Sequence, residues 1–204
     1  MSQKLVSTIF KQISTLFITK LKIDSEVQQK NIQLKREKLS EVYLNLTSII
    51  NSFPNESPSD ILQEIKYSPH YLSENFDAIL ISLDYQIEDY KNQLSNINIT
   101  YSQKNDISTE ISNREHAKNQ IVKIRDKYYE AKDKFDDWYL SSKNIFDLYA
   151  HQNVKNQLAV FKIVIHNTFI SGYSSKNIDN PLENNIKICR QNLIMSIRND
   201  LGIK

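Results

Sequence analysis

The first 23 residues carry a periodic pattern of apolar and basic positions. At 100° per residue, the apolar positions fall on one side of a helix, and Lys4, Lys11 and Lys22 lie opposite them. Lys20 projects into the apolar face, which is formed by Leu5, Val6, Ile9, Phe10, Ile13, Leu16, Phe17 and Leu21. The pattern predicts an amphipathic helix over residues 1–23. Its longest apolar run is three residues, whereas a membrane span needs about twenty, so we expect neither a transmembrane helix nor a signal peptide.

A heptad spacing follows, which predicts a separate second helix over about residues 25–53. Its apolar positions recur at steps of seven, three or four residues: Ile32, Leu39, Val42, Leu46, Ile49 and Phe53. Pro54 then breaks the pattern. The segments Ser57-Pro58 and Ser68-Pro69 each combine an N-cap residue with a proline at the first helical position. We therefore expect a short helix to about residue 67 and a long one from there to about residue 99.

The longest predicted helix begins near Ser108 and has five successive apolar d positions. With Arg114 at position a, the other a positions are Ile121, Tyr128, Phe135, Ser142 and Tyr149, and the d positions are Ala117, Ile124, Ala131, Trp138 and Ile145. The pattern loses its phase near His151, which predicts a kink or break. Residues 158–170 are apolar nearly all round, so we expect them to form the most buried helix. Gly172 would end it, and a last helix would run from Asn180-Pro181 to Gly202.

Arg114 occupies a seam position, where a cation is costly unless an acid pairs with it. Glu110 lies one turn earlier and can provide that pair. Two interpretations follow: a polar residue that sets the register of the seam, or a frayed and wet end of the seam. We favour the wet end.

These helices define an all-α protein, an elongated antiparallel helical bundle with long coiled-coil-like helices. The expected organisation is an amphipathic N-terminal helix, residues 1–23, followed by a helical bundle domain, residues 24–204. An intermolecular coiled coil along the longest seam is the alternative.

Glycine is scarce, and its scarcity excludes several mechanisms. The chain has two glycines in 204 residues, thirty positions apart. A P-loop, a dinucleotide-binding turn, a kinase loop and a Gly-x-Ser-x-Gly elbow each need two or more glycines in one short loop. We therefore expect no bound nucleotide cofactor and no enzymatic activity of these classes.

Charge gives no general attraction to nucleic acid. Residues 1–23 carry four lysines and no acid, whereas residues 24–204 hold 22 basic and 24 acidic residues. Where lysines cluster, between residues 123 and 134, acids interleave with them, so the local field nearly cancels. We expect no nucleic-acid partner. The single cysteine, Cys189, excludes an internal disulfide and fits a cytoplasmic setting.

A metal site also lacks support in the sequence. The four histidines do not occur in His-Glu-x-x-His or Glu-x-x-His, the spacings that place two ligands on one face of a helix. Two acidic series have metal-binding spacing, Glu74-x-x-Asp77 and Glu130-x-x-Asp133-x-x-Asp136, but they fall on the solvent side of their seams. We therefore expect these acids to form solvated faces of the helices. A helical-bundle carboxylate-metal hydrolase is the alternative.

The N-terminal helix remains as the candidate functional feature. Its candidate contact residues are Lys4, Phe10, Lys11, Phe17 and Lys22. Its apolar face could dock onto the protein's own bundle, onto another protein or a second copy, or onto an anionic membrane surface. We expect a non-enzymatic protein-binding adaptor or regulatory protein, cytoplasmic or at the inner face of the membrane. The peripheral membrane adaptor is the alternative.

Two short segments resemble parts of small uncharacterised bacterial helical proteins, many of which carry an N-terminal membrane anchor. The segments are Lys35-Arg36-Glu37-Lys38-Leu39-Ser40-Glu41-Val42-Tyr43 and Ile197-Arg198-Asn199-Asp200-Leu201-Gly202. This chain differs because an amphipathic helix stands where the anchor would be. The resemblance implies a bacterial or phage-related setting and no particular activity.

Overall fold

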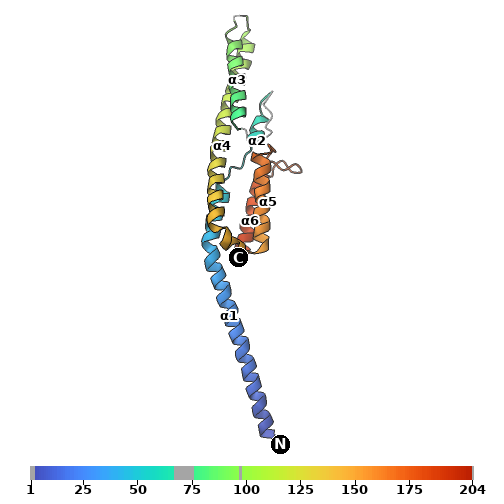
Figure 1. The fold of residues 1–204 in the computed structure, drawn as a ribbon. Helices are drawn as coiled ribbons and strands as arrows, with labels where there is room; N and C mark the ends of the chain where they lie inside the picture. The colour runs from blue at the N-terminus through green and yellow to red at the C-terminus, as the bar shows by residue number, and fades with distance from the viewer. Residues whose placement is uncertain (1–2, 67–75, 97, 204) are drawn as a thin grey trace.

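The computed structural model describes residues 3–66, 76–96 and 98–203, with side chains from residue 14 onward. Over these residues the secondary structure consists of α-helices and one isolated β-bridge between Lys176 and Asn184, which confirms the all-α prediction. The helices are α1 (Gln3–Ser52), α2 (Pro58–Leu62), α3 (Phe76–Leu94), α4 (Tyr101–Tyr149), α5 (Gln152–Phe169) and α6 (Asn185–Asp200). The molecule is elongated, and the N-terminal half of α1 extends away from the other helices (Figure 1).

The C-terminal part of α1 packs antiparallel to α4. The indole Nε1 of Trp138 donates a hydrogen bond to the carbonyl oxygen of Val42 at 3.1 Å. Farther along, the ring centroids of Phe53 and Tyr128 lie 6.3 Å apart. Because residue numbers rise along α1 as they fall along α4, the two helices run in opposite directions. Helices α3 and α4 form one hairpin and α5 and α6 another, as predicted for an antiparallel bundle (Figure 1).

Tyr128 is the centre of the aromatic core. Its ring stacks on Phe169 of α5 at 4.9 Å and lies 6.1 Å from Phe76 of α3. Phe53, the residue after α1, contacts Tyr128 and also meets Phe161 of α5 edge to face at 5.7 Å. Three helices and the residue that follows α1 therefore contribute to one cluster of rings, in the offset and edge-on arrangements that aromatic pairs prefer.

The predicted seam of α4 is buried as far as Trp138. Beyond that residue the buried positions leave the predicted heptad register, earlier than the expected break near His151. The buried positions are Arg114, Ala117, Ile121, Ile124, Tyr128, Ala131, Phe135 and Trp138. Beyond them, Ile145, the predicted d residue, is 37% exposed, while Phe146 is 5% exposed. A straight helix has 3.6 residues per turn and so drifts out of a 3.5-residue repeat. The predicted break near His151 is confirmed, because Ala150 leaves the helical conformation and His151 is the N-cap of α5.

Capping explains where the helices begin. The predicted start of α2 is confirmed by a capping box in which the Ser57 hydroxyl accepts from Asp60 N and the Asp60 carboxylate accepts from Ser57 N. Helix α4 begins at Tyr101, seven residues before the predicted Ser108, because Thr100 and Gln103 form a second capping box. The apolar pattern could not locate this start because the first turns of α4 are polar.

The last helix begins later than predicted. Asn184 is its N-cap, accepting a hydrogen bond from Lys187 N at 3.0 Å, so α6 starts at Asn185 and not at Pro181. Gly172 and Gly202 both have positive φ, 75° and 67°, which fits the predicted role of glycine after a helix.

Helix α5 is apolar on two faces but buried on one. Val154, Leu158 and Phe161 are buried, whereas Val160 is 43% exposed and Ile163 is 57% exposed. The apolar residues that surround the segment 158–170 are therefore not all buried. The hairpin with α6 covers only part of the circumference of α5.

Arg114 lies in a dry and fully paired site, so the favoured wet-end interpretation is wrong. Its side chain is 1% exposed. It donates to the Glu110 carboxylate at 2.5 Å, to the Gln86 side-chain oxygen at 2.8 Å and to the Lys66 carbonyl at 2.6 Å. The guanidinium also lies over the Tyr90 ring, 4.6 Å from its centroid. Arg114 therefore joins α4 to α3 and to the segment after α2.

The two helices expected on either side of residue 24 are a single one. Helix α1 is continuous from Gln3 to Ser52, and residues 23 and 24 are both helical. No proline or glycine interrupts it, so the chain offers no reason for a break. Burial begins much later, at Leu39, which is 0% exposed.

Candidate interaction surface

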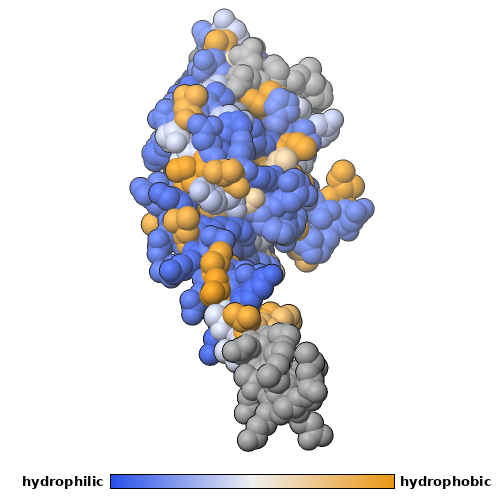
Figure 2. All heavy atoms as spheres, turned by 60° about the horizontal axis from the view of Figure 1, so that its bottom comes forward, coloured by the Kyte–Doolittle hydropathy of each residue, from blue (hydrophilic) through white to orange (hydrophobic). Residues whose placement is uncertain are grey.

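Residues 14–34 of α1, which we call the arm, have every side chain exposed to solvent. They include eight large apolar side chains, each 47–70% exposed: Leu16, Phe17, Ile18, Leu21, Ile23, Val27, Ile32 and Leu34. In the space-filling view, hydrophobic groups come to the surface near the base of the molecule, where α1 leaves the body (Figure 2). A run of exposed apolar side chains of this length is typical of a binding surface.

The described part of the arm does not dock on the protein's own bundle. Of the candidate contact residues, Phe17 is 64% exposed and Lys22 is exposed. Lys4, Phe10 and Lys11 lie within α1, but their side chains fall outside the described part of the structure. The sequence left docking on the bundle open, and over residues 14–34 the structure decides against it.

Asp200 at the end of α6 fixes the arm where it leaves the body. Its carboxylate accepts hydrogen bonds from Lys35 Nζ at 2.5 Å, from Tyr43 Oη at 2.5 Å and from the backbone N–H of His151 at 2.9 Å. Although burial alone would raise its pKa, these three donors hold the pKa of Asp200 below its ordinary value. Burial and the hydrogen bond to Asp200 raise the pKa of Tyr43 far above its usual range.

Gly202 brings the chain end against the same region of α1. A Cβ atom built there would lie 2.4 Å from Nη2 of Arg36. The positive φ of Gly202 turns the chain after α6 toward α1. The sequence predicted that Gly202 ends the last helix, but no pattern in it predicted the contacts of Asp200 with Lys35 and Tyr43.

The far end of α1 is held by Arg190 of α6. Its guanidinium donates to the carbonyl oxygens of Ile50 at 2.9 Å and Phe53 at 2.8 Å, and to the Asn55 side chain at 2.6 Å. These carbonyls are among the groups that a helix end leaves without an internal partner. Helix α1 is thus fastened at both ends of its buried part by α6.

The acidic series lie on exposed surfaces and pair with cations. Glu130 accepts from Lys134 at 2.6 Å, and Asp136 lies 3.5 Å from Lys132. Asp77 accepts from Arg125 of α4 at 3.0 Å, and Glu74 lies outside the described residues. Among the residues that the structure describes, no three His, Cys, Asp or Glu side chains form a group that could hold a metal ion.

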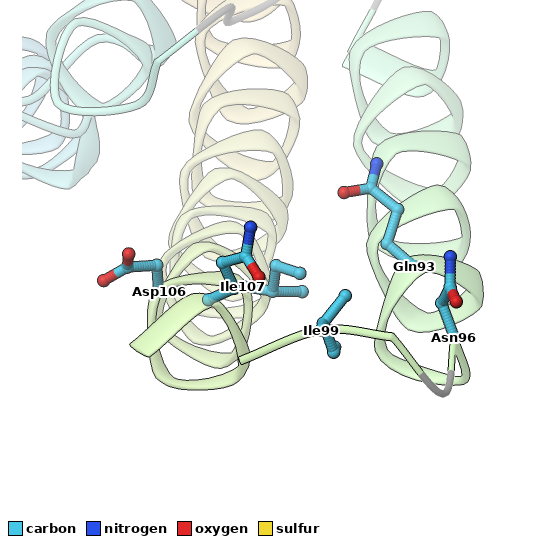
Figure 3. Close-up of a pocket in the computed structure, with 6 residues that line it drawn as sticks. Gln93, Asn96, Ile99, Asp106 and Ile107 are labelled. Atoms are coloured by element: carbon cyan, nitrogen blue, oxygen red, sulfur yellow. The ribbon is translucent and has the colours of Figure 1, made fainter. Parts of the chain in front are cut away.

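The pocket at the turn between α3 and α4 is lined by few ionisable side chains. The pocket at the α3–α4 turn, of about 400 Å³, is lined mainly by amide and isoleucine side chains: Gln93, Asn96, Ile99, Gln103, Asp106 and Ile107 (Figure 3). Among the described residues that line it, Asp106 is charged. Ile99 lies between the two helices at the base of this hairpin in the close-up (Figure 3).

A larger open cleft of about 920 Å³ lies between α4 and the segment before α6. Four lysines and three glutamates are among its lining residues, so its charges are mixed. Asp60 borders it but is engaged, because its carboxylate accepts from the hydroxyls of Ser174 and Ser175 at 2.5 Å. Ser52, Ser175 and His116 also line this cleft, but the two serine hydroxyls donate elsewhere, to the carbonyl oxygen of Ile49 and to the Asp60 carboxylate.

Comparison with known proteins gives no relative: no family model, curated protein or solved structure matches this chain. Over the described residues, none of the helices has the length and apolar character needed to cross a bilayer. The arm is therefore the surface from which a function can be argued.

Proposed function

We propose that this chain is a non-enzymatic helical adaptor that binds another protein through its arm. The observation that carries the proposal is the exposure of eight large apolar side chains on the arm, the part of α1 in which every described side chain is exposed. Single helices are marginal in water, so a helix of this kind gains most of its stability from packing against a partner. Amphipathic helices bind partner grooves and partner helices through such anchors.

The distribution of apolar residues around the arm favours a protein over a flat surface. At about 100° per residue, Leu16 and Ile18 lie about 160° apart around the helix axis. A membrane surface covers one face of a helix, whereas a groove or a set of helices can enclose more of it. Phe17 with Lys20 and Lys22 supports the peripheral membrane adaptor as the second candidate, because bulky apolar and basic residues together suit an anionic bilayer.

Photo-crosslinking from the arm tests the proposal. A photoreactive amino acid replaces Ile23 in the arm in one variant, and replaces Tyr101, which is 88% exposed on the body, in a control variant. In the cell that makes the protein, we expect the Ile23 variant to give a discrete protein adduct that the Tyr101 variant lacks. The proposal would be contradicted if the Ile23 variant gave no protein adduct. It would also be contradicted if the purified chain hydrolysed nucleotides or RNA and the double variant Glu130→Ala with Asp133→Ala lost that activity.

Vesicle flotation separates the second candidate from the first. The full chain and a chain lacking residues 1–23 are each mixed with anionic phospholipid vesicles. Flotation of the full chain alone would favour the membrane adaptor, and equal behaviour of the two chains would eliminate it.

A further inference from the structure

A second apolar stripe runs along α1 on the face turned away from the body. Its apolar members, all exposed, are Leu16, Ile23, Val27, Leu34 and Leu44. They fall at positions a and d of one heptad register, with steps of seven, four, seven and ten residues. We call this set of positions the outer seam. Its register differs from that of the buried positions Leu39, Val42 and Leu46, which face the bundle.

The outer seam continues past the arm onto the body. Leu44 is 71% exposed although its neighbours Val42, Tyr43 and Leu46 are at most 5% exposed. No helix of the described bundle covers Leu44, so the same face of α1 stays open from Leu16 onward. From Leu16 to Leu44 the seam spans about 42 Å at about 1.5 Å per residue, enough for four heptads.

Four charged residues occupy the remaining positions of the outer seam, and their order is asymmetric. Lys20 and Lys30 lie toward the N-terminus, and Glu37 and Glu41 toward the C-terminus. All four side chains are exposed. A partner that covers this seam must therefore provide acids opposite the lysines and tolerate acids farther along.

A second copy of α1 running antiparallel meets this requirement. We propose that two copies of this chain pair through their outer seams in antiparallel orientation, with Lys20 of each copy opposite Glu37 of the other. In this register Ile23 lies opposite Leu34 of the second copy, and Val27 opposite Lys30, whose methylene stem can cover it. Leu16 lies opposite Glu41, toward the ends of the paired segment. The proposal rests on the protein-binding role proposed for the arm, and it names the partner.

A parallel pair and the two antiparallel registers one heptad away do not set opposite charges of the outer seam face to face. In a parallel pair, each of the four charged positions faces its own copy, so lysines meet lysines and glutamates meet glutamates. Moving the antiparallel register by one heptad toward the N-terminus sets Lys20 opposite Lys30 of the second copy. Moving it one heptad the other way leaves Lys20 opposite Leu44 and Glu37 opposite Val27. Of these arrangements, only the proposed register sets opposite charges of the outer seam face to face. A register two heptads away sets Lys30 opposite Glu41 but leaves Glu37 opposite Leu34.

A charge exchange tests both the pairing and its register. Sedimentation equilibrium of the full chain at tens of micromolar should show a dimer. Lys20→Glu alone and Glu37→Lys alone should each weaken the dimer by about tenfold or more, since each sets two pairs of like charges face to face. The double variant Lys20→Glu with Glu37→Lys should restore the affinity to within about threefold of the unchanged chain. Lys104→Glu makes the same change of charge at an exposed position of α4, away from α1, and is the matched control that should leave the dimer intact.

Two results would overturn the proposal. A chain that stays monomeric at about 100 μM has no self-pairing of this kind, and a double variant as weak as the single variants excludes this register. Circular dichroism of all variants shows that the bundle stays folded, because every substituted side chain is exposed. If the chain is monomeric but the Ile23 crosslinker captures a different protein, the self-pairing fails and the adaptor proposal stands. If the arm gives no protein adduct at all, the adaptor proposal itself fails.

Discussion

Buried charge marks the residues on which the fold depends most. Arg114 is the largest side chain among those with less than 2% exposure, and four partners surround its guanidinium. A charge this deep is tolerated only when each of its donors finds an acceptor. Within the described residues, no buried side-chain nitrogen or oxygen lacks a hydrogen-bond partner. The hydrogen bonds around Arg114 therefore stabilise the fold only when all of the partners are present.

Replacing Arg114 should be costly. Arg114→Ala leaves Glu110 and the Lys66 carbonyl without their donor, and we expect the free energy of unfolding to fall by about 3 kcal/mol. Urea denaturation measures this change. Arg125→Ala is the control, because Arg125 also pairs with acids but at the surface, and it should cost less than about 1 kcal/mol. Equal effects of the two variants would show that the Arg114 site is not special.

Asp200 should make the stability depend on pH. Its pKa is lower in the folded chain than the ordinary 3.8, so its contribution is complete at neutral pH and is lost as the pH falls below about 4. Asp200→Asn should cost about 1 to 2 kcal/mol at pH 7, and the difference from the unchanged chain should shrink between about pH 5 and pH 2. Unfolding in urea at a series of pH values measures it. Asp133→Asn, at an exposed position, should show no such convergence, and a constant Asp200→Asn difference across the series would refute the assignment.

At the scale of elements, α1 is one helix with two environments. Its C-terminal part, from Leu39, packs on α4 and is fastened by Asp200 and Arg190. In its arm, by contrast, every side chain is exposed. The stability of the body should therefore depend little on the arm.

Removing the arm tests this separation. A chain that begins at Leu34 keeps Lys35 and its ion pair with Asp200. We expect its free energy of unfolding to stay within about 1 kcal/mol of the full chain, because the deleted side chains that are described are all exposed. Circular dichroism and urea denaturation give the comparison. An unfolded or strongly destabilised product would mean that the arm packs on the body.

The elements that the sequence predicted well are those with a strong apolar period. The seam of α4 from Ala117 to Trp138 and the start of α2 follow from spacing and from a capping box, which are local properties. The start of α4 and the continuity of α1 were missed, since both lie where polar residues carry no periodic signal. Spacing also cannot show which face of an amphipathic helix a distant segment will cover. For this reason the outer seam became visible only once the inner face of α1 was known.

At the scale of the whole molecule, the all-α elongated bundle could be predicted, but its polar connections could not. Asp200 meets Lys35 across 165 residues of chain, and Arg114 reaches Lys66 across 48. Such contacts depend on how helices are arranged in space, and no periodic pattern encodes them. The sequence points to a candidate surface at the N-terminus, which stays a prediction, whereas the extent of the exposed apolar positions along α1 required the structure.

The absence of a break in α1 has a geometrical consequence for anything bound to the arm. A helix without a joint transmits rotation as well as position, so each residue of the arm has a fixed angular phase relative to the bundle. One inserted residue near position 34 would turn the bound partner by about 100° about the axis and shift it by about 1.5 Å, whereas a loop would absorb the change. The arm is thus a rigid extension of the bundle. The number of residues between the contact surface and the body determines which way a bound partner faces.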